Sequence, residues 1–206
     1  FGIKPNKALG ISIPNLRKLA KEIGKNHKLA LLLWRSGVHE ARILAGLIDE
    51  VDKVTEKQMD SWIKDFDSWD VCDLVCANLF DKTPFAFKKA IEWTKRKREF
   101  EKRAGFALMA CLAWHDKKAG DNKFLKFFPA IKRESVDERN YVKKAVNWAL
   151  RQIGKRNRNL NKEAIKIALL IQNKESKSAR WIANDALREL KSEAVQKRLS
   201  TIRSTK

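Results

Sequence analysis

Four stretches of the chain decide its fold: HEARILAGLI (39–48), EKRAGFALMACLA (101–113), DERNYVKKAVNWALRQI (137–153) and ESKSARWIANDALREL (175–190). In each, apolar residues recur with the period of an amphipathic α-helix. An Arg or Lys near the start of each stretch is followed by a face rich in alanine. Because small alanine faces let neighbouring helices approach closely, the four stretches predict stacked helical pairs.

The rest of the chain has the same periodicity, and no segment shows the alternation of a half-buried strand. Pro14 suits the first turn of an opening helix, and Gly24 suits its end. Further helices are predicted at about 27–35, 38–49, 55–65, 69–79, 84–97, 99–114, 121–133, 137–153, 160–172, 176–190 and 192–202. The chain is therefore predicted to be all-α.

The short predicted helices recur as pairs roughly every 35–40 residues, a spacing typical of helical repeats. This favours an α-solenoid of about six helical pairs, formed as a single domain over residues 1–206. The similarity between the repeats is weak. An irregular helical bundle therefore remains the alternative.

The charge of the chain restricts its partners. Its 206 residues include 45 Lys or Arg and 25 Asp or Glu, for a formal net charge of +20, and 44% of residues are hydrophobic. This balance favours a polyanion, whether nucleic acid, an anionic membrane surface or an acidic protein. A solvated basic surface that only keeps the protein soluble is the alternative. No apolar run approaches the roughly 18 residues of a membrane span.

The cysteines and histidines predict neither a disulfide framework nor a metal site. Cys72, Cys76 and Cys111 are odd in number, and no cluster of histidines accompanies them. Cys72 and Cys76 lie one helical turn apart, which is typical of buried packing. The N-terminus, FGIKPN, has no initiator Met and no signal-peptide pattern, so we expect a chain cut from a longer one, in the cytoplasm.

The segment FDSWDVCD (66–73) is the most informative for function. Ser68 or Asp67 can cap a helix that starts at Trp69, and Asp70 is favourable in its first turn. Trp69 and Asp73 then share one face of that helix. Asp73 is harder to explain as a cap than Asp70 is, so it is either a functional carboxylate or a surface or salt-bridged one.

Two later segments place arginine and tryptophan in a similar setting. Arg103 opens an apolar helix, where a partly buried Arg normally pairs with a carboxylate. Trp148 lies among basic residues and is a candidate platform for a sugar or base, or else a core residue below a solvated face. The basic residues around it are Lys143, Lys144, Arg151, Lys155, Arg156 and Arg158.

The remaining tryptophans are assigned from their positions on the helices. Trp34, Trp62, Trp93 and Trp114 fall on apolar stripes and are predicted to lie in the core, whereas the position of Trp181 is left open.

Together these motifs resemble the DNA alkylation repair glycosylases of the AlkD type. The resemblance rests on SWDVCD (68–73), KRAGFAL (102–108) and VKKAVNWALRQIGKRN (142–157), in this order and at these separations. LGISIPNLRKLAK (9–21) and HEARILAGLID (39–49) resemble the family as well, so the likeness covers about residues 1–190. It implies HEAT-like repeats that form a concave, basic, DNA-wrapping surface.

The resemblance also implies an activity. Such enzymes hydrolyse the N-glycosidic bond of cationic alkylated purines, such as N3-methyladenine and N7-methylguanine, in duplex DNA. They need neither a cofactor nor extrusion of the base. Asp73 matches the catalytic carboxylate of the family, and Arg103 matches the arginine associated with it and with the DNA backbone. Trp69 and Trp148 match the tryptophans that pack against the backbone and deoxyribose of the lesion.

Contacts with the DNA backbone are expected as well, and the residues expected to make them are Ser12, Arg17, Lys21, Lys143, Lys144 and Arg151. Phe1 stands where the family has an aromatic residue near its site. Two features depart from the family: the first helices are absent or shortened, and Cys111 occupies the place of a basic residue.

Two functions follow as alternatives. The first is a monofunctional alkylpurine glycosylase, a cytoplasmic, nucleoid-associated monomer whose partner is double-stranded DNA with alkylated bases and which makes no membrane contact. The second is a non-catalytic HEAT-repeat protein that binds damaged or branched DNA. A basic protein scaffold is a weaker third reading.

Overall fold

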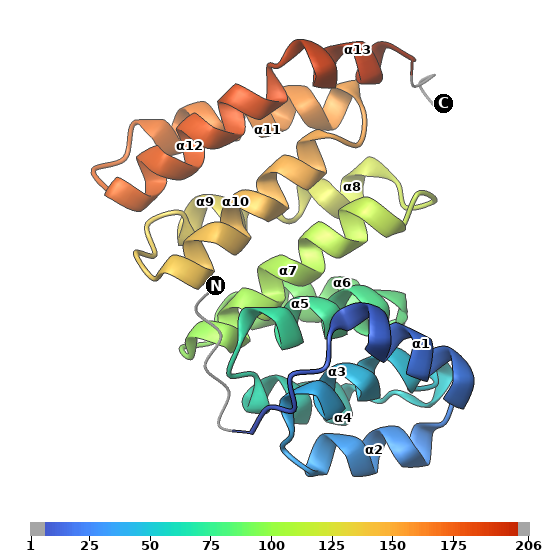
Figure 1. The fold of residues 1–206 in the computed structure, drawn as a ribbon. Helices are drawn as coiled ribbons and strands as arrows, with labels where there is room; N and C mark the ends of the chain where they lie inside the picture. The colour runs from blue at the N-terminus through green and yellow to red at the C-terminus, as the bar shows by residue number, and fades with distance from the viewer. Residues whose placement is uncertain (1–6, 202–206) are drawn as a thin grey trace. The chain divides into compact units, whose positions relative to one another are not determined.

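The computed structural model describes residues 7–201, which fold into helices joined by short loops and contain no strand (Figure 1). The all-α prediction is confirmed. The chain divides into two compact units, residues 1–86 and residues 87–206. No helix in the described part of the chain is long and apolar enough to cross a membrane.

Unit 1 is built from two layers of helices. Its elements are α1 (Ile13–Ile23), α2 (His27–Arg35), α3 (His39–Ile48), η1 (Val51–Lys53), α4 (Glu56–Trp62), η2 (Ile63–Asp65), α5 (Trp69–Asn78) and η3 (Phe80–Lys82). In one layer α3 packs between α1 and α5, and α2 packs on α3 from the other layer. The rings of Trp34 on α2 and Trp62 on α4 stack with centroids 3.9 Å apart, which joins the helices of the second layer.

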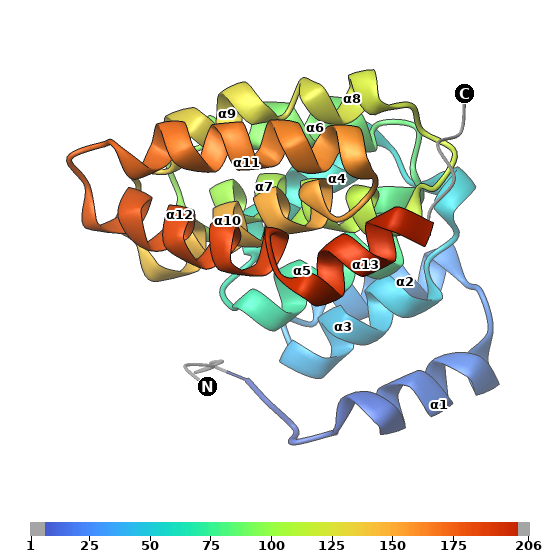
Figure 2. The same ribbon diagram turned by 90° about the horizontal axis from the view of Figure 1, so that it is seen from above.

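The first helix begins and ends where the sequence predicts. Pro14 lies in the first turn, and Gly24 ends α1 with φ 74°, a conformation that favours glycine. Leu16 is the buried residue of α1. The segment before α1 is held by Glu40 at the start of α3, whose carboxylate accepts hydrogen bonds from the backbone N–H of Leu9 (2.9 Å) and of Gly10 (2.7 Å). Figure 2 shows α1 beside α3.

Unit 2 is also layered. Its helices are α6 (Ala86–Trp93), which begins at the boundary, then α7 (Glu99–His115), α8 (Asp121–Leu125), α9 (Phe128–Glu134), α10 (Asn140–Gly154), α11 (Arg158–Gln172), α12 (Lys177–Leu190) and α13 (Glu193–Thr201). In one layer α10 packs between α7 and α12, and α9 and α11 cover α10 from the other layer (Figure 2).

Two glycines allow close approach within unit 2. A Cβ at Gly105 of α7 would lie 2.8 Å from the backbone nitrogen of Thr94 and 2.9 Å from the carbonyl oxygen of Ala90. A Cβ at Gly154 would lie 2.7 Å from Leu190 and 2.8 Å from the Cβ of Ala164. These distances are shorter than carbon contacts allow, so helix packing here requires glycine.

Two predicted helices differ from the structure at a proline. The predicted helix 121–133 is two helices, α8 and α9, because Pro129 has no N–H to donate to Leu125 and lies in the first turn of α9. The predicted helix 84–97 is shorter, because the chain turns at Thr83 and Pro84 before α6 begins at Ala86.

Three of the four tryptophans predicted to lie in the core are buried: Trp34, Trp62 and Trp93. The prediction for Trp114 is wrong, since its side chain is 58% exposed at the end of α7, with its ring stacked on His115. Cys72, Cys76 and Cys111 are all buried thiols. This matches the packing role predicted for the pair on α5.

Candidate nucleic-acid interface

Trp69 and Asp73 lie one turn apart on α5, and both side chains are half-buried. The helix begins after Ser68, as the sequence predicts, although the Ser68 hydroxyl forms no capping hydrogen bond. Val71 and Val75, on the opposite side of α5, are fully buried, and so are Cys72 and Cys76. The core therefore fixes this helix and leaves Trp69 and Asp73 on its partly exposed face.

Two contacts with α3 hold the start and the middle of α5. The Oδ2 of Asp70 lies 2.8 Å from the Nε2 of His39, and both side chains are largely buried. A Cβ at Gly46 would lie 3.0 Å from the Cγ2 of Val75, so α3 and α5 approach closely. A carboxylate that must meet a ligand gains accuracy when its helix is fixed in this way.

Arg103 joins α7 to the start of α10. Its side chain is buried, and its Nη1 donates a 2.7 Å hydrogen bond to the carbonyl oxygen of Tyr141. The rings of Phe100 and Tyr141 pack at 5.2 Å beside it. The predicted position of Arg103 at the buried edge of its helix is thus observed, with a backbone acceptor on α10.

The neighbouring residue Lys102 binds acids that precede α10. Its ammonium pairs with Glu134 and lies 3.2 Å from the Oδ2 of Asp137. Burial alone would raise the pKa of Asp137, but hydrogen bonds from Arg139 and Lys102 outweigh it and hold the pKa below its ordinary value. Ionised Asp137 therefore helps to fix the turn in front of α10.

Trp148 is half-buried on α10 and lies two turns after Tyr141 on the same side of the helix. Ala145, Val146, Ala149 and Leu150 form the buried face of α10. Part of the indole of Trp148 thus reaches the surface, as a stacking platform requires.

The basic residues around Trp148 differ in how they are bound. Lys144 is exposed, and the Nζ of Lys143 lies 5.2 Å from the ring centroid of Trp181 on α12. The Nη1 of Arg151 forms salt bridges with Asp185 (3.2 Å) and Glu189 (2.7 Å) of α12. Arg151, which is predicted to contact the DNA backbone, thus already has carboxylate partners within unit 2.

Arg156 has a structural role. Its guanidinium lies 3.9 Å from the ring centroid of Phe124 and donates to the carbonyl oxygens of Ala113 and Ala119. Burial lowers the pKa of Arg156 from its ordinary value, although Asp116 and Asp121 act in the opposite direction. Arg156 thus holds the loop after α7.

The residues predicted near the N-terminus are accessible. Ser12, Arg17 and Lys21 are exposed, and Arg17 and Lys21 lie one turn apart on α1. Neither cation forms a salt bridge with the described residues. Their charges are therefore available to an anion. Phe1 lies outside the described residues.

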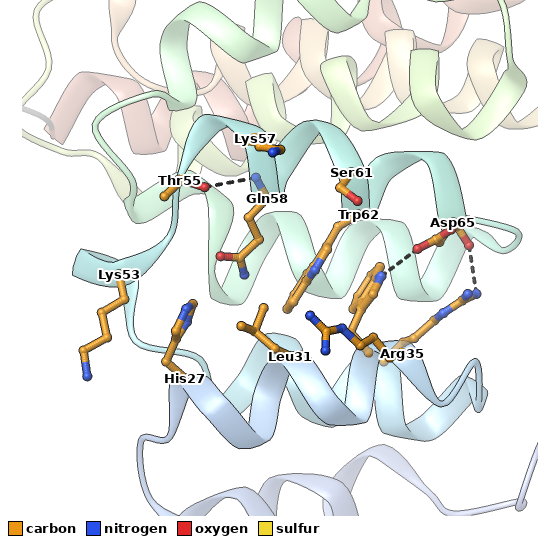
Figure 3. Close-up of a pocket in the computed structure, with 12 residues that line it drawn as sticks. His27, Leu31, Arg35, Lys53, Thr55, Lys57, Gln58, Ser61, Trp62 and Asp65 are labelled. Atoms are coloured by element: carbon orange, nitrogen blue, oxygen red, sulfur yellow. Dashed lines mark hydrogen bonds between the residues drawn. The ribbon is translucent and has the colours of Figure 1, made fainter.

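A groove of about 510 Å³ lies between α2 and α4, over the stacked rings of Trp34 and Trp62 (Figure 3). None of the residues predicted to be functional lines it, and several of its polar side chains have partners within unit 1. The indole N–H of Trp34 donates to Asp65, and both His27 and Gln58 contact the carboxylate of Asp49. Its lining comes mainly from α2 and α4, with single residues of α3, η1 and η2, so no local sequence pattern predicts it.

The sequence-predicted residues thus fall into two groups. Trp69 and Asp73 lie together on α5 of unit 1, and Arg103 and Trp148 lie on adjacent helices of unit 2. For one surface residue, Trp181, the sequence predicted neither a core nor a surface position. Trp181 is 41% exposed, and the buried stripe of α12, which includes Ala179, Ile182 and Ala183, could have placed it on the outer face.

Comparison with a solved structure defines the class of fold. A structure described as "a new family of proteins related to the HEAT-like repeat DNA glycosylases with affinity for branched DNA structures" superposes with a TM-score of 0.71 and 22% sequence identity. The match covers 90% of this chain and 84% of the other. The chain is therefore a helical protein of the HEAT-like repeat fold, which confirms the expected fold class.

The family of this chain follows from its match to a protein-family model. Residues 1–190 match the family described as "DNA alkylation repair enzyme", so the chain belongs to that family. Among curated proteins, none is significantly similar to this chain.

Proposed function

We propose that this protein is a DNA glycosylase that removes cationic alkylated purines from duplex DNA. The observation that carries the proposal is the pair of Trp69 and Asp73, an aromatic ring and a carboxylate one turn apart on the partly exposed face of a fixed helix. Family membership and the exposed cations of α1 and α10 support it.

The chemistry requires little more than a positioned carboxylate. In N7-methylguanine or N3-methyladenine the base already carries a positive charge, so the C1′–N bond breaks with its electron pair leaving on the base, which departs neutral. Positive charge then develops on the deoxyribose. Asp73 would stabilise this oxocarbenium character and accept a proton from the water that adds to C1′.

The other residues have binding roles in this proposal. Trp69 and Trp148 would pack on the sugar and backbone of the damaged nucleotide, since an indole face suits an apolar sugar ring. Arg103 would contact the DNA backbone. Ser12, Arg17, Lys21, Lys143 and Lys144 would contact phosphates. Arg151 would contribute less than its position suggests, because α12 already neutralises it.

The experiment is a base-release assay on methylated duplex DNA. We expect purified protein to release 7-methylguanine and to leave abasic sites without strand scission. Asp73→Asn should reduce the rate of release by about 10²–10³-fold, because an electrostatic stabiliser of the transition state is removed, and should retain DNA affinity. Asp52→Asn, the same change at an exposed carboxylate of unit 1, should leave release unchanged. Full activity of Asp73→Asn would contradict the mechanism.

A second function is favoured by the description of the structural neighbour, which names affinity for branched DNA. In this case the chain would bind DNA without releasing any base. Wild-type protein that releases no base from methylated DNA, and that binds a four-way junction more tightly than a duplex, would establish this alternative.

A further inference from the structure

Helices α10 and α12 of unit 2 contact each other through a regular series of polar pairs. Residues at successive turns of α10 meet residues at successive turns of α12. From the start of the helices toward their ends, the pairs are Lys143 with Trp181 (5.2 Å from Nζ to ring centroid), Asn147 with Asp185 (2.7 Å), Arg151 with Glu189 (2.7 Å) and Lys155 with Glu189 (2.6 Å).

The charge of this series changes along its length. At the C-terminal end, Arg151 and Lys155 are paired with the acids of α12. At the N-terminal end, Lys143 meets a ring instead of a carboxylate, and the exposed cations Lys144, Lys177 and Arg180 lie in the same first turns. Carboxylates also lie near this end. Glu99 accepts a hydrogen bond from the N–H of Tyr141, and Asp137 is bound by Lys102 and Arg139. Glu138 accepts from the hydroxyl of Ser176 and the N–H of Ser178, and its charge interacts with Lys143 and Lys177 without forming a salt bridge. The cations at the N-terminal end thus differ from Arg151 and Lys155, because they form no salt bridge with the described residues.

Helical geometry relates this end to Trp148. Successive residues of an α-helix are turned by about 100°, so Lys144 lies between Lys143 on the α12 side and Trp148 on the α7 side. Tyr141, on the same side as Trp148, packs on Phe100 of α7, and Lys143 meets Trp181, which confirms the two directions. Trp181 thus extends the surface that carries Trp148 by one helix.

Trp181 is also unusually exposed for its size. Its side chain is 41% exposed, beside a buried stripe of small residues that already packs α12 onto its neighbours. Packing within unit 2 therefore does not require an indole at this position. An exposed aromatic ring among cations that form no salt bridge is an arrangement that binds nucleic acid by stacking and phosphate contact.

We propose that Trp181 and Lys143 form a second DNA-contacting subsite in unit 2, separate from Trp148. The occupant is the backbone of duplex DNA: the indole packs on a deoxyribose, and the ammonium of Lys143 binds the adjacent phosphate. This inference rests on the DNA-binding part of the proposed function and not on base removal.

The test measures affinity for a fluorescently labelled, unmethylated duplex over a range of salt concentrations. Trp181→Ala should weaken binding about tenfold at every salt concentration, with an unchanged slope of log affinity against log salt, because the lost contact is uncharged. Lys143→Gln should make that slope less steep by about one, because one phosphate contact is lost. Trp181→Phe, which keeps an aromatic ring, should retain most of the affinity.

Trp114→Ala is the matched control, since it removes another exposed tryptophan of unit 2 that lies at the end of α7. It should bind as the wild type does. Binding by Trp181→Ala that equals that of the wild type and of Trp114→Ala overturns the proposal. Equal weakening by Trp181→Ala and Trp114→Ala also overturns it, because the effect is then not local. A wild-type chain that binds duplex DNA but releases no base contradicts the glycosylase proposal alone.

Discussion

Lys144 and Arg151 lie two turns apart on the same side of α10, but their surroundings differ. Lys144 is exposed, whereas Arg151 is held by Asp185 and Glu189. A cation that already has carboxylate partners gains less from a phosphate, because it must give up those partners to bind it. Equal charges on one helix are therefore not equal contributions to DNA binding.

This difference predicts different effects of two substitutions that each remove one positive charge. Lys144→Gln should make the slope of log affinity against log salt less steep by about one and leave the midpoint of thermal unfolding unchanged. Arg151→Gln should leave the slope nearly unchanged and lower the free energy of unfolding by up to about 1 kcal/mol, the usual limit for partly exposed ion pairs. Binding titrations and thermal melts of both variants check this. If Arg151→Gln made the slope less steep and Lys144→Gln left it unchanged, Arg151 would have to leave its acids to bind DNA.

At this scale, the position of each functional residue on its helix could be predicted from the sequence, but the residues it contacts on other helices could not. Trp69 and Asp73 share a helix face because four residues make about one turn. Arg151 meets acids that lie 34 to 38 residues later, on a helix whose packing angle no local pattern determines. Trp114 was misplaced because it continues an apolar stripe past the point where neighbouring helices cover α7.

At the scale of the element, Gly105 sets the distance between α6 and α7. A Cβ there would press on backbone atoms of Ala90 and Thr94, which cannot move without shifting α6. Gly105→Ala should therefore lower the free energy of unfolding by about 1–3 kcal/mol, as overpacked cores do. Urea titration checks this value. Gly120→Ser is the control, because nothing lies within 4 Å of the Cβ position and a serine can cap α8. An unchanged midpoint for Gly105→Ala would contradict the packing argument.

The segment before α1 should detach at acid pH. Burial alone would raise the pKa of Glu40, but hydrogen bonds from the backbone N–H of Leu9 and Gly10 outweigh it and hold the pKa below its ordinary value. The stabilisation is therefore complete above the pKa of Glu40 in the unfolded chain. It is lost as the pH falls through the lower pKa of the folded chain.

Hydrogen exchange of the Leu9 and Gly10 amides reports this detachment. Their protection should fall with the pH after correction for the intrinsic exchange rate. In Glu40→Gln protection should be low at all pH values, because a neutral amide is a weaker acceptor. Glu22→Gln, at an exposed position of α1, is the control and should keep the wild-type profile. Protection that does not depend on pH in the wild type would exclude Glu40 as the anchor.

Most of the helices could be predicted from their period, because most of them bury one stripe of their own residues. Helix α7 is an exception, since it is buried on all sides from Arg103 to Ala113. The ends depended on specific residues: Gly24 ends α1, and the side chain of Thr55 caps α4 by accepting from the N–H of Gln58. The break between α8 and α9 was missed because the apolar period continues across it, although Pro129 marks the place. Proline should have outweighed periodicity there.

At the scale of the whole molecule, the net charge of +20 gives the most general prediction. The logarithm of DNA affinity should fall linearly with the logarithm of salt concentration, with a slope of about −0.9 per phosphate neutralised. The measured slope counts the phosphate contacts that the whole chain makes. Fluorescence anisotropy between low and physiological salt measures it. A flat response would contradict DNA binding of either kind.

The three buried cysteines make the folding of the two units separately visible. Cys72 and Cys76 lie in unit 1, and Cys111 lies in unit 2. A thiol reagent reaches each one only when the surrounding helices open, so the number of labels per molecule identifies which unit has opened. Mass spectrometry during labelling in low denaturant should show a species with two labels if unit 1 opens first and one label if unit 2 does. A direct passage from none to three would mean that the units unfold as one cooperative body.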